Sequence, residues 1–187
     1  VGTQIITKGY HFENVTLVGI LWADLNLHFP VFNASETTLQ KLIQVAGRAG
    51  RQKKESRVIV QAIHNHDIFK HINEVDYLDF CKQEMEMREQ NNYPPFGRLV
   101  QIELKNTNPL QLDKETEQFA QLLNQRNVSE KLEISILGPA RPIVYKIQKT
   151  ECRHIFLKTD SFAKVHNLLQ NIDIKKFKSK IYVVPTP

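Results

Sequence analysis

Two consecutive prolines near the middle of the 187-residue chain, Pro94 and Pro95, set the strongest limit on how it can fold. Neither continues a helix or donates to the middle of a sheet, because proline has no backbone N–H and its ring fixes φ. They stand in the segment NNYPPFG, residues 91–97, whose glycine favours a turn. We therefore predict two domains, residues 1–92 and 93–187.

The first half of the chain alternates strands and helices. The run VTLVGILWAD, residues 15–24, is almost continuously apolar, which is typical of a parallel strand covered on both faces. We expect a helix with Ser35 as its N-cap, a strand over 56–63, and a long connecting helix over about 67–90. This alternation predicts an α/β domain with a parallel sheet, and Asp24 would lie at the carboxyl end of its strand, where ligands of such sheets bind.

The second half predicts a different architecture. Its expected order is strand, helix, three successive strands, helix and strand. We place the strands at 98–105, 132–137, 144–148, 153–158 and 180–184, and the helices at 109–125 and 161–171. This βαββαβ order is typical of a split βαβ α+β domain, with two helices on one face of an antiparallel sheet.

Charge is concentrated in the last part of the chain. Residues 138–187 carry ten Lys or Arg and three acidic residues, whereas the preceding residues carry fewer basic than acidic side chains. A basic excess of this kind is either a solvated face or the electrostatic signature of a nucleic-acid binder. Charge alone does not separate these two interpretations.

Cysteine and apolar content exclude several other classes. Cys81 and Cys152 stand far apart with no CxxC spacing, so neither a structural metal site nor a disulfide framework is indicated, and a reducing cytoplasm is the natural location. No apolar run approaches the roughly 20 residues that cross a bilayer, so we expect no membrane partner. The chain begins with Val1, which indicates a piece of a longer protein.

The segment QVAGRAGR, residues 44–51, combines two glycines with two arginines. On one continuous helix, Gln44, Arg48 and Arg51 would lie within about 60° of each other. Gly47 and Gly50 each cost about 1 kcal/mol relative to alanine in a helix, so the close approach of a phosphate or another backbone would explain them. The alternative is an exposed helix end, with Gly50 as its cap and Arg51 at the negative end of the dipole.

Several segments together resemble the motifs of one helicase family. GTQIITKGYHF (residues 2–12), VTLVGILWAD and QVAGRAGR resemble, in order and spacing, motifs V and VI of superfamily 2 helicases. More closely, they resemble the primosomal replication-restart DNA helicases, whose motif V has the form GTQ-x3-KG. The resemblance continues through YPPF (93–96) and LGPARP (137–142) and covers almost the whole chain. An ordered set is far more specific than a lone GRxGR.

The resemblance implies an ATP-driven enzyme that unwinds DNA from 3′ to 5′ at stalled forks and recombination intermediates and restarts replication by primosome assembly. Its cofactors would be ATP and Mg²⁺, with zinc in a cysteine-rich insert of the full-length protein. This chain has neither a GxxxxGK[ST] loop nor a DExH box. It is therefore expected to be the latter part of the second RecA-like lobe and the C-terminal domain, inactive alone and without a metal. Expected partners are forked and single-stranded DNA, other primosome proteins and single-stranded-DNA-binding protein, in the bacterial cytoplasm.

The same resemblance assigns roles to residues of motifs V and VI. Arg51 would be the arginine finger that reaches the γ-phosphate, with Arg48 and Gln44 binding phosphate or orienting the attacking water. Thr3 would hold a DNA phosphate, and the less favoured alternative is that it is only a β-branched residue of a strand. Two further residues, Lys8 and Gly9, would lie in the loop that links DNA to nucleotide.

The C-terminal half resembles the family's last domain, which is similar in fold to a small ribosomal protein and assists in binding DNA at branch points. Here Tyr145 is expected in a hairpin, where a base could stack on it. The basic residues expected around it are Arg141, Lys146, Lys149 and Arg153. Alternatively, Tyr145 packs on the sheet and the basic residues only increase solubility.

A second class of function stays open: a stand-alone basic nucleic-acid-binding or assembly module without enzymatic activity. An RNA-recognition domain would show paired aromatic residues on adjacent central strands, and Tyr145 and Phe156 do not form such a string. A metabolic α/β enzyme is disfavoured, because no Ser-His-Asp order, metal cluster or GxGxxG is visible.

Overall fold

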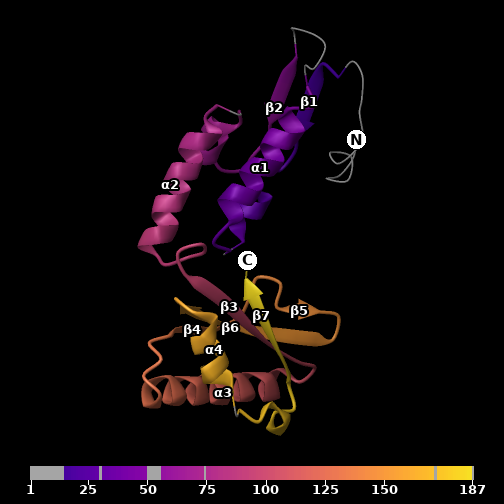
Figure 1. The fold of residues 1–187 in the computed structure, drawn as a ribbon. Helices are drawn as coiled ribbons and strands as arrows, with labels where there is room; N and C mark the ends of the chain where they lie inside the picture. Colours follow the sequence, from indigo (N-terminus) through magenta and orange to yellow (C-terminus); the bar gives the residue numbers. More distant parts are fainter. Residues whose placement is uncertain (1–14, 30, 50–55, 74, 171, 187) are drawn as a thin grey trace. The chain divides into compact units, whose positions relative to one another are not determined.

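The computed structural model describes residues 15–29, 31–49, 56–73, 75–170 and 172–186 (Figure 1). The chain forms two compact units, with the break between Glu86 and Met87. One contains a small parallel sheet and the other an antiparallel sheet, so the protein is of mixed α/β class. The division into a helicase-lobe domain (1–92) and a C-terminal domain (93–187) stays a prediction. Within the described residues, no helix combines the length and the apolar content that crossing a membrane requires.

The first unit is built around two parallel strands joined through a helix. β1 (Leu17–Ile20) pairs with β2 (Arg57–Val60), and α1 (Ala34–Ala46) lies between them in the chain. This confirms the predicted parallel pair. The other elements are η2 (Leu25–His28), η3 (Asp67–His71) and most of α2 (Tyr77–Gln90), whose last four residues belong to the second unit.

The core of this unit is small and comes from the loops and helices that follow the strands. The buried apolar residues that form its core cluster are Ala23, Leu39, Leu42, Ile68 and Phe80. The prediction that the first strand is covered on both faces is wrong for the described residues, because Leu17 and Ile59 are 59% and 58% exposed. In the described part of the unit, α1 packs against β1, whereas β2 is largely exposed.

Both ends of α1 differ from the predicted ones. Its N-cap position is occupied by Asn33 instead of Ser35, and the Thr37 hydroxyl donates to the Asn33 carbonyl at 2.7 Å. The helix ends at Ala46, with Gly47 as C-cap, and Arg48 N–H donates to Val45 in a tighter three-residue turn. Arg48 therefore lies beyond the helix.

The long helix predicted over about 67–90 is wrong, because the structure divides it into η3 and α2. Asn73 breaks it: its side-chain oxygen accepts from the Asp76 N–H at 2.7 Å, and its amide donates to the Asp76 carboxylate at 2.6 Å. A side chain that bonds the backbone in this way competes with helical hydrogen bonding.

The break predicted at Pro94 and Pro95 is confirmed, since α2 ends at Gln90 and β3 begins at Arg98. The turn between them is tight: both Phe96 and Gly97 donate to the Tyr93 carbonyl, at 3.0 and 3.1 Å. A Cβ at Gly97 would lie 2.3 Å from the Asn92 oxygen. The position requires glycine because the backbone passes so close.

The second unit contains a five-stranded antiparallel sheet, in which β4, β6, β3 and β7 are neighbours in that order and β5 pairs with β6 beside β4. This confirms the predicted strand-and-helix order of a split βαβ domain (Figure 1). The elements are β3 (Arg98–Asn106), α3 (Pro109–Ser129), β4 (Ser135–Ala140), β5 (Lys146–Ile147), β6 (Thr150–Thr159), α4 (Phe162–Leu169), η4 (Ile174–Lys176) and β7 (Lys180–Thr186).

Capping residues in the sequence fix where both long helices begin. Asn108 accepts a hydrogen bond from the Gln111 N–H at 3.2 Å, and Pro109 follows it at the first helical position. Ser161 accepts from the Ala163 N–H at 3.1 Å and begins α4.

Both helices cover the same face of the sheet, as predicted. The alternating residues Val100, Ile102 and Leu104 of β3 enter one core with α3 and α4. Because alternate residues of a strand point to opposite faces, Gln101, Glu103 and their neighbours lie on the other, helix-free face. That face carries two aromatic residues, Phe156 on β6 and Tyr182 on β7, and β3 separates their strands.

Candidate nucleic-acid interface

A tight hairpin presents two of the basic residues predicted to bind DNA, Lys146 and Lys149. Ile147 of β5 pairs with Thr150 of β6, so Gln148 and Lys149 alone form the connection. Gln148 has φ of +55°, a conformation in which side chains other than Gly, Asn and Asp are uncommon. Lys149 is exposed at the tip of this connection.

An arginine covers the aromatic residue of the hairpin. The Arg141 guanidinium carbon lies 4.3 Å from the centre of the Tyr145 ring, within the range of a cation–π contact. Tyr145 is half-buried and Arg141 is exposed. The pair therefore offers a flat, positively charged surface in place of a bare tyrosine ring.

The buried carboxylate of Glu151 organises the cations around the hairpin. Its oxygens lie 3.7 Å from Arg141 Nη2, 3.7 Å from Lys146 Nζ and 3.4 Å from Arg153 Nη2. The Glu151 side chain is 8% exposed, whereas those of Arg141 and Lys146 are 54% and 53% exposed. Glu151 therefore holds two accessible cations beside each other.

The expectation that Arg153 belongs to this exposed surface is wrong. Arg153 is 5% exposed, and its Nε lies 2.7 Å from the Asp113 carboxylate of α3. It shares the helix-covered face with Ile155 and Leu157, two and four residues further along β6. Its charge is used inside the fold, in pairs with Asp113 and Glu151.

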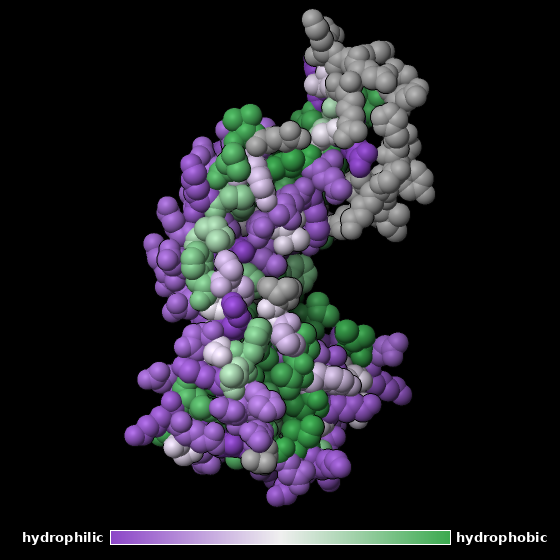
Figure 2. Space-filling model, viewed as in Figure 1, coloured by the Kyte–Doolittle hydropathy of each residue, from purple (hydrophilic) through white to green (hydrophobic). Residues whose placement is uncertain are grey.

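Apolar side chains lie among the exposed cations, and the sequence did not indicate them as surface residues. Ile143, Val144 and Ile147 are 56%, 55% and 64% exposed. Figure 2 shows hydrophobic residues at the surface of this unit among hydrophilic ones. We define the hairpin surface as Arg141, Ile143, Val144, Tyr145, Lys146, Ile147 and Lys149.

The residues assigned to the nucleotide side of motifs V and VI are only partly within the described chain. Gln44 is exposed on α1, and Arg48 is half-buried in the turn that follows it. Because the helix ends before Arg48, the shared helical face predicted for the two residues is wrong. Arg51, Lys8, Gly9 and Thr3 lie outside the described residues.

A buried carboxylate marks the carboxyl ends of the parallel strands, near the predicted position. Asp24 is fully buried, and its Oδ2 accepts from the N–H groups of His64 and Ile63 at 2.9 and 3.0 Å. Burial alone would raise the pKa of Asp24, but backbone hydrogen bonds and the charge of His28 outweigh it and lower that pKa. The ionised carboxylate thus joins the segments after β1 and β2.

Three histidines cluster beside this carboxylate, with His28 Nε2 3.7 Å from Asp24 Oδ2, and the sequence reasoning missed them. The ring centres of His28, His64 and His66 lie 5.7 to 6.4 Å apart. Among the described residues, Asp24 Oδ1 and His66 Nε2 are buried and have no hydrogen-bond partner. The sequence feature that could have indicated this cluster is the segment HNH, residues 64–66, because its two histidines directly follow the second predicted strand. A cavity of about 480 Å³ adjoins this cluster, lined by Val60, Ala62, Ile63, His64, Asn65, Phe69 and Ile72.

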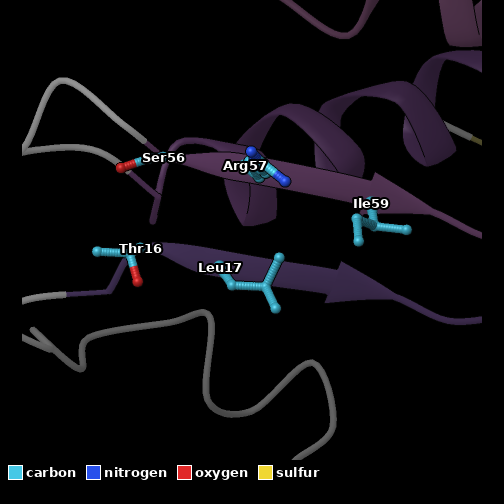
Figure 3. Close-up of a pocket in the computed structure, with 5 residues that line it drawn as sticks. All are labelled: Thr16, Leu17, Ser56, Arg57 and Ile59. Atoms are coloured by element: carbon cyan, nitrogen blue, oxygen red, sulfur yellow. The ribbon is translucent and has the colours of Figure 1, made fainter.

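A larger cavity, of about 610 Å³, lies at the amino-terminal ends of the same strands (Figure 3). Leu17 of β1 and Arg57 and Ile59 of β2 line it, together with Thr16 and Ser56, which immediately precede the two strands. Ligands of parallel sheets bind at the opposite, carboxyl ends. Arg57 is the one charged side chain among its described lining residues, so this cavity shows no convergent chemistry.

Metal-ligating side chains converge at one place in the described part of the chain. Glu103, Cys152 and His154 lie on the helix-free face with their ligating atoms all within 4.8 Å of one another. The sequence reasoning expected no metal site, because it considered Cys152 only in relation to Cys81.

Comparison with known proteins supports both halves of the sequence interpretation. A family model described as the primosomal protein N C-terminal domain matches residues 89–184. Proteins named replication restart protein PriA are similar over nearly the whole chain. That of Synechocystis sp. is 35% identical over 173 residues, 92% of this chain and 20% of the relative.

Two further relatives with the same name give a similar picture. The protein of Borreliella burgdorferi is 31% identical over 185 residues, 98% of this chain and 28% of the relative. That of Bacillus subtilis is 33% identical over 181 residues, 96% of this chain and 22% of the relative. The chain therefore spans between a fifth and somewhat over a quarter of the length of these relatives.

Proposed function

The chain belongs to the PriA family of replication restart proteins, and from this we propose that it is the latter part of a DNA helicase that restarts replication. The full-length enzyme would hydrolyse ATP with Mg²⁺, unwind DNA from 3′ to 5′ at stalled forks and recombination intermediates, and assemble the primosome. The similarity to PriA relatives across both units supports this proposal.

The first unit would be the latter part of the second RecA-like lobe. Its parallel strands, joined through α1, are consistent with such a lobe. Arg51 would act as the arginine finger, with Arg48 and Gln44 close to the nucleotide and Lys8 and Gly9 in the loop between nucleotide and DNA. Thr3 would bind a DNA phosphate. The phosphate-binding loop would come from a preceding lobe, since the sequence contains no GxxxxGK[ST].

The second unit would bind DNA through the hairpin surface. The observation that carries this assignment is a set of three exposed cations: Lys146 and Lys149 of the hairpin, and Arg141 of the segment that leads into it. Exposed cations bind the phosphates of either strand without reading sequence. The guanidinium of Arg141, stacked on Tyr145, supplies a flat cation on which an unpaired base can stack.

The exposed apolar residues of the hairpin surface favour DNA with unpaired bases over an uninterrupted duplex. Ile143, Val144 and Ile147 gain little from contact with phosphates, but they can cover a base or sugar that has left the stack. Forks present such bases where the strands separate. We expect other primosome proteins and single-stranded-DNA-binding protein as partners in the bacterial cytoplasm, and zinc in the cysteine-rich insert of the full-length protein.

Salt-dependent DNA binding tests the assignment of the hairpin surface. We compare the chain with the variant Arg141→Ala/Lys146→Ala/Lys149→Ala on forked and single-stranded DNA. If each cation contacts one phosphate, the slope of log K against log salt on single strands should flatten by about 2, since each contact contributes about 0.7.

A matched variant separates the hairpin from general charge. Lys175, Lys176 and Lys178 are exposed in the same unit, and their triple alanine variant removes the same charge. It should leave the slope nearly unchanged. If both variants weaken binding equally, the cations act only through net charge, and the assignment of DNA binding to the hairpin is wrong.

A further inference from the structure

We propose that Glu103, Cys152 and His154 form a binding site for a divalent metal ion of the borderline class, such as Zn²⁺, between the two central strands of the second unit. The three residues provide a carboxylate oxygen, a thiolate sulfur and an imidazole nitrogen, whose ligating atoms lie within 4.8 Å of one another. The proposal depends on the sheet alone and is independent of the proposed function.

The strand register brings the ligands together. Glu103 on β3 is the direct partner of His154 on β6, and Cys152 stands two residues before His154 on the same face. Directly opposed side chains have Cβ atoms about 5 Å apart. The backbone therefore fixes all three ligands in the most regular part of the unit, which favours a preorganised site.

The observed spacing is close to tetrahedral coordination. His154 Nε2 and Glu103 Oε1 are 3.4 Å apart. Ligands held at 2.0 to 2.1 Å on a tetrahedral zinc ion are separated by about 3.3 Å, so this pair already spans one edge. A sulfur ligand at about 2.3 Å lies about 3.6 Å from the other two ligands, so the sulfur separations, which are at most 4.8 Å now, would shorten by about 1.2 Å at most.

The surroundings are arranged to orient ligands and admit an ion. Lys105 Nζ lies 2.8 Å from Glu103 Oε2, which leaves Oε1, on the side of His154, to bind the metal. Fixing a ligating carboxylate through its second oxygen is a common way to orient it. Glu103 and His154 have side chains 19% and 16% exposed, so an ion can enter from the helix-free face.

Two present contacts would be exchanged on binding. The Cys152 thiol faces the Val144 carbonyl at 3.6 Å, and the Gln101 amide lies 3.3 Å from His154 Nε2. The ion would replace the thiol proton, and Gln101 would turn its amide oxygen toward the fourth position or leave that position to water. Sulfur, nitrogen and oxygen ligands together select zinc and related ions over Mg²⁺ and Ca²⁺, which prefer oxygen alone.

Cobalt substitution tests the site in the purified, metal-stripped 187-residue chain. Co²⁺ should bind at one equivalent and give a thiolate-to-cobalt charge-transfer band with intense visible bands, the signature of tetrahedral coordination that includes sulfur. Added Zn²⁺ should displace Co²⁺ and remove both the charge-transfer band and the visible bands. Cys152→Ser should remove the charge-transfer band, and Glu103→Gln and His154→Gln should each weaken binding by about 100-fold or more, since each removes one of three protein ligands.

Matched variants make the outcome decisive. Cys81→Ser and His166→Gln remove the chain's other cysteine and an exposed histidine of α4, and both should keep the full cobalt spectrum. Circular dichroism should show that Cys152→Ser remains folded, and Zn²⁺ should raise the melting temperature of the parent chain but not of this variant. An absent band, or one that survives Cys152→Ser or disappears in Cys81→Ser, overturns the proposal.

Discussion

Glu115, in the middle of α3, accepts a hydrogen bond from the backbone N–H of Ser179 at 2.8 Å, immediately before β7 begins. The same carboxylate accepts from the Lys178 N–H at 2.9 Å and from the Gln111 amide at 2.7 Å. A single buried acid therefore attaches the last strand of the sheet to the helix layer.

This relationship predicts a pH-dependent stability. Burial alone would raise the pKa of Glu115, but the hydrogen bonds from Ser179, Lys178 and Gln111 outweigh it and lower the pKa from 4.5 to about 2. Because the folded-state pKa is depressed, the stabilisation is present above about pH 5 and is lost as pH falls toward 2. Glu115→Gln should lower the free energy of unfolding at pH 7 by about 2 kcal/mol and by little near pH 2.

Urea unfolding between pH 2 and pH 7 measures this effect. Glu117→Gln is the control, since it removes an exposed carboxylate from the same helix. An equal pH slope in the parent chain and Glu115→Gln would show that the carboxylate does not anchor the strand.

Arg153→Ala should destabilise the second unit without acting on DNA directly. The substitution leaves Glu151 buried with one fewer cation and removes the partner of Asp113, so we expect a loss of about 3 kcal/mol. Arg141 also pairs with Glu151, but its side chain is exposed. Arg141→Ala should therefore lower the free energy of unfolding by about 1 kcal/mol or less.

DNA affinity measured on the folded fraction separates the two roles. It should fall for Arg141→Ala and remain near the parent value for Arg153→Ala. If a stable Arg153→Ala variant binds DNA as weakly as Lys146→Ala, then Arg153 contacts DNA directly and the structural role assigned to it is wrong.

Gly97→Ala should be among the most damaging small substitutions in the turn. The added Cβ would lie 2.3 Å from the Asn92 carbonyl oxygen, so the backbone of the turn must move. We expect a loss of about 2 kcal/mol or more in thermal or urea unfolding. Gly19→Ala is the matched control, because a Cβ there meets no atom within 4 Å. Equal effects of the two substitutions would contradict the steric argument.

Arg51→Ala, made in the full-length protein, should lower ATPase kcat by about 10³ or more and leave DNA affinity nearly unchanged, because an arginine finger acts on charge that develops during phosphoryl transfer. Arg51→Lys should restore little, since lysine lacks the planar fork. Lys54→Ala serves as the nearby control. If Arg51 is only a helix-end residue, Arg51→Ala will instead cost about 1 kcal/mol or less of stability with normal kcat.

The 187-residue chain alone should show no DNA-stimulated ATP hydrolysis. The sequence contains no GxxxxGK[ST] segment to hold the phosphates. Phosphate release should match that of an identically purified preparation without the chain. Turnover above that level, abolished by Arg51→Ala, would show that one lobe suffices.

The elements of the second unit could be predicted well, because strand alternation and helix-capping residues are visible within short stretches of sequence. The alternation of Val100, Ile102 and Leu104 predicts a half-buried strand, and Asn108-Pro109 and Ser161 fix where the helices begin. The same alternation along β6 places Arg153 with Ile155 and Leu157, so its burial was available in the pattern. The exposed position of Arg153 was inferred from charge alone, and that was the error.

Other features depend on partners distant in the sequence. Asp24 is joined to His64, 40 residues away, and no local pattern links the two. The division between η3 and α2 depends on two hydrogen bonds between the Asn73 side chain and Asp76, in a stretch whose composition suits a helix. The grouping of Glu103 with Cys152 and His154 requires the register of β3 against β6, which sequence reasoning does not supply.

β6 serves three roles at once along ten residues. Its Thr150 and Glu151 pair with the hairpin strand, Arg153 points to the helix layer, and Cys152 and His154 point to the helix-free face. Deleting a single residue near its centre would exchange the two faces for every position beyond it. Evolution can therefore vary the side chains of this strand one at a time, but insertions and deletions within it should be much rarer among working members of the family than in the loop before Tyr145.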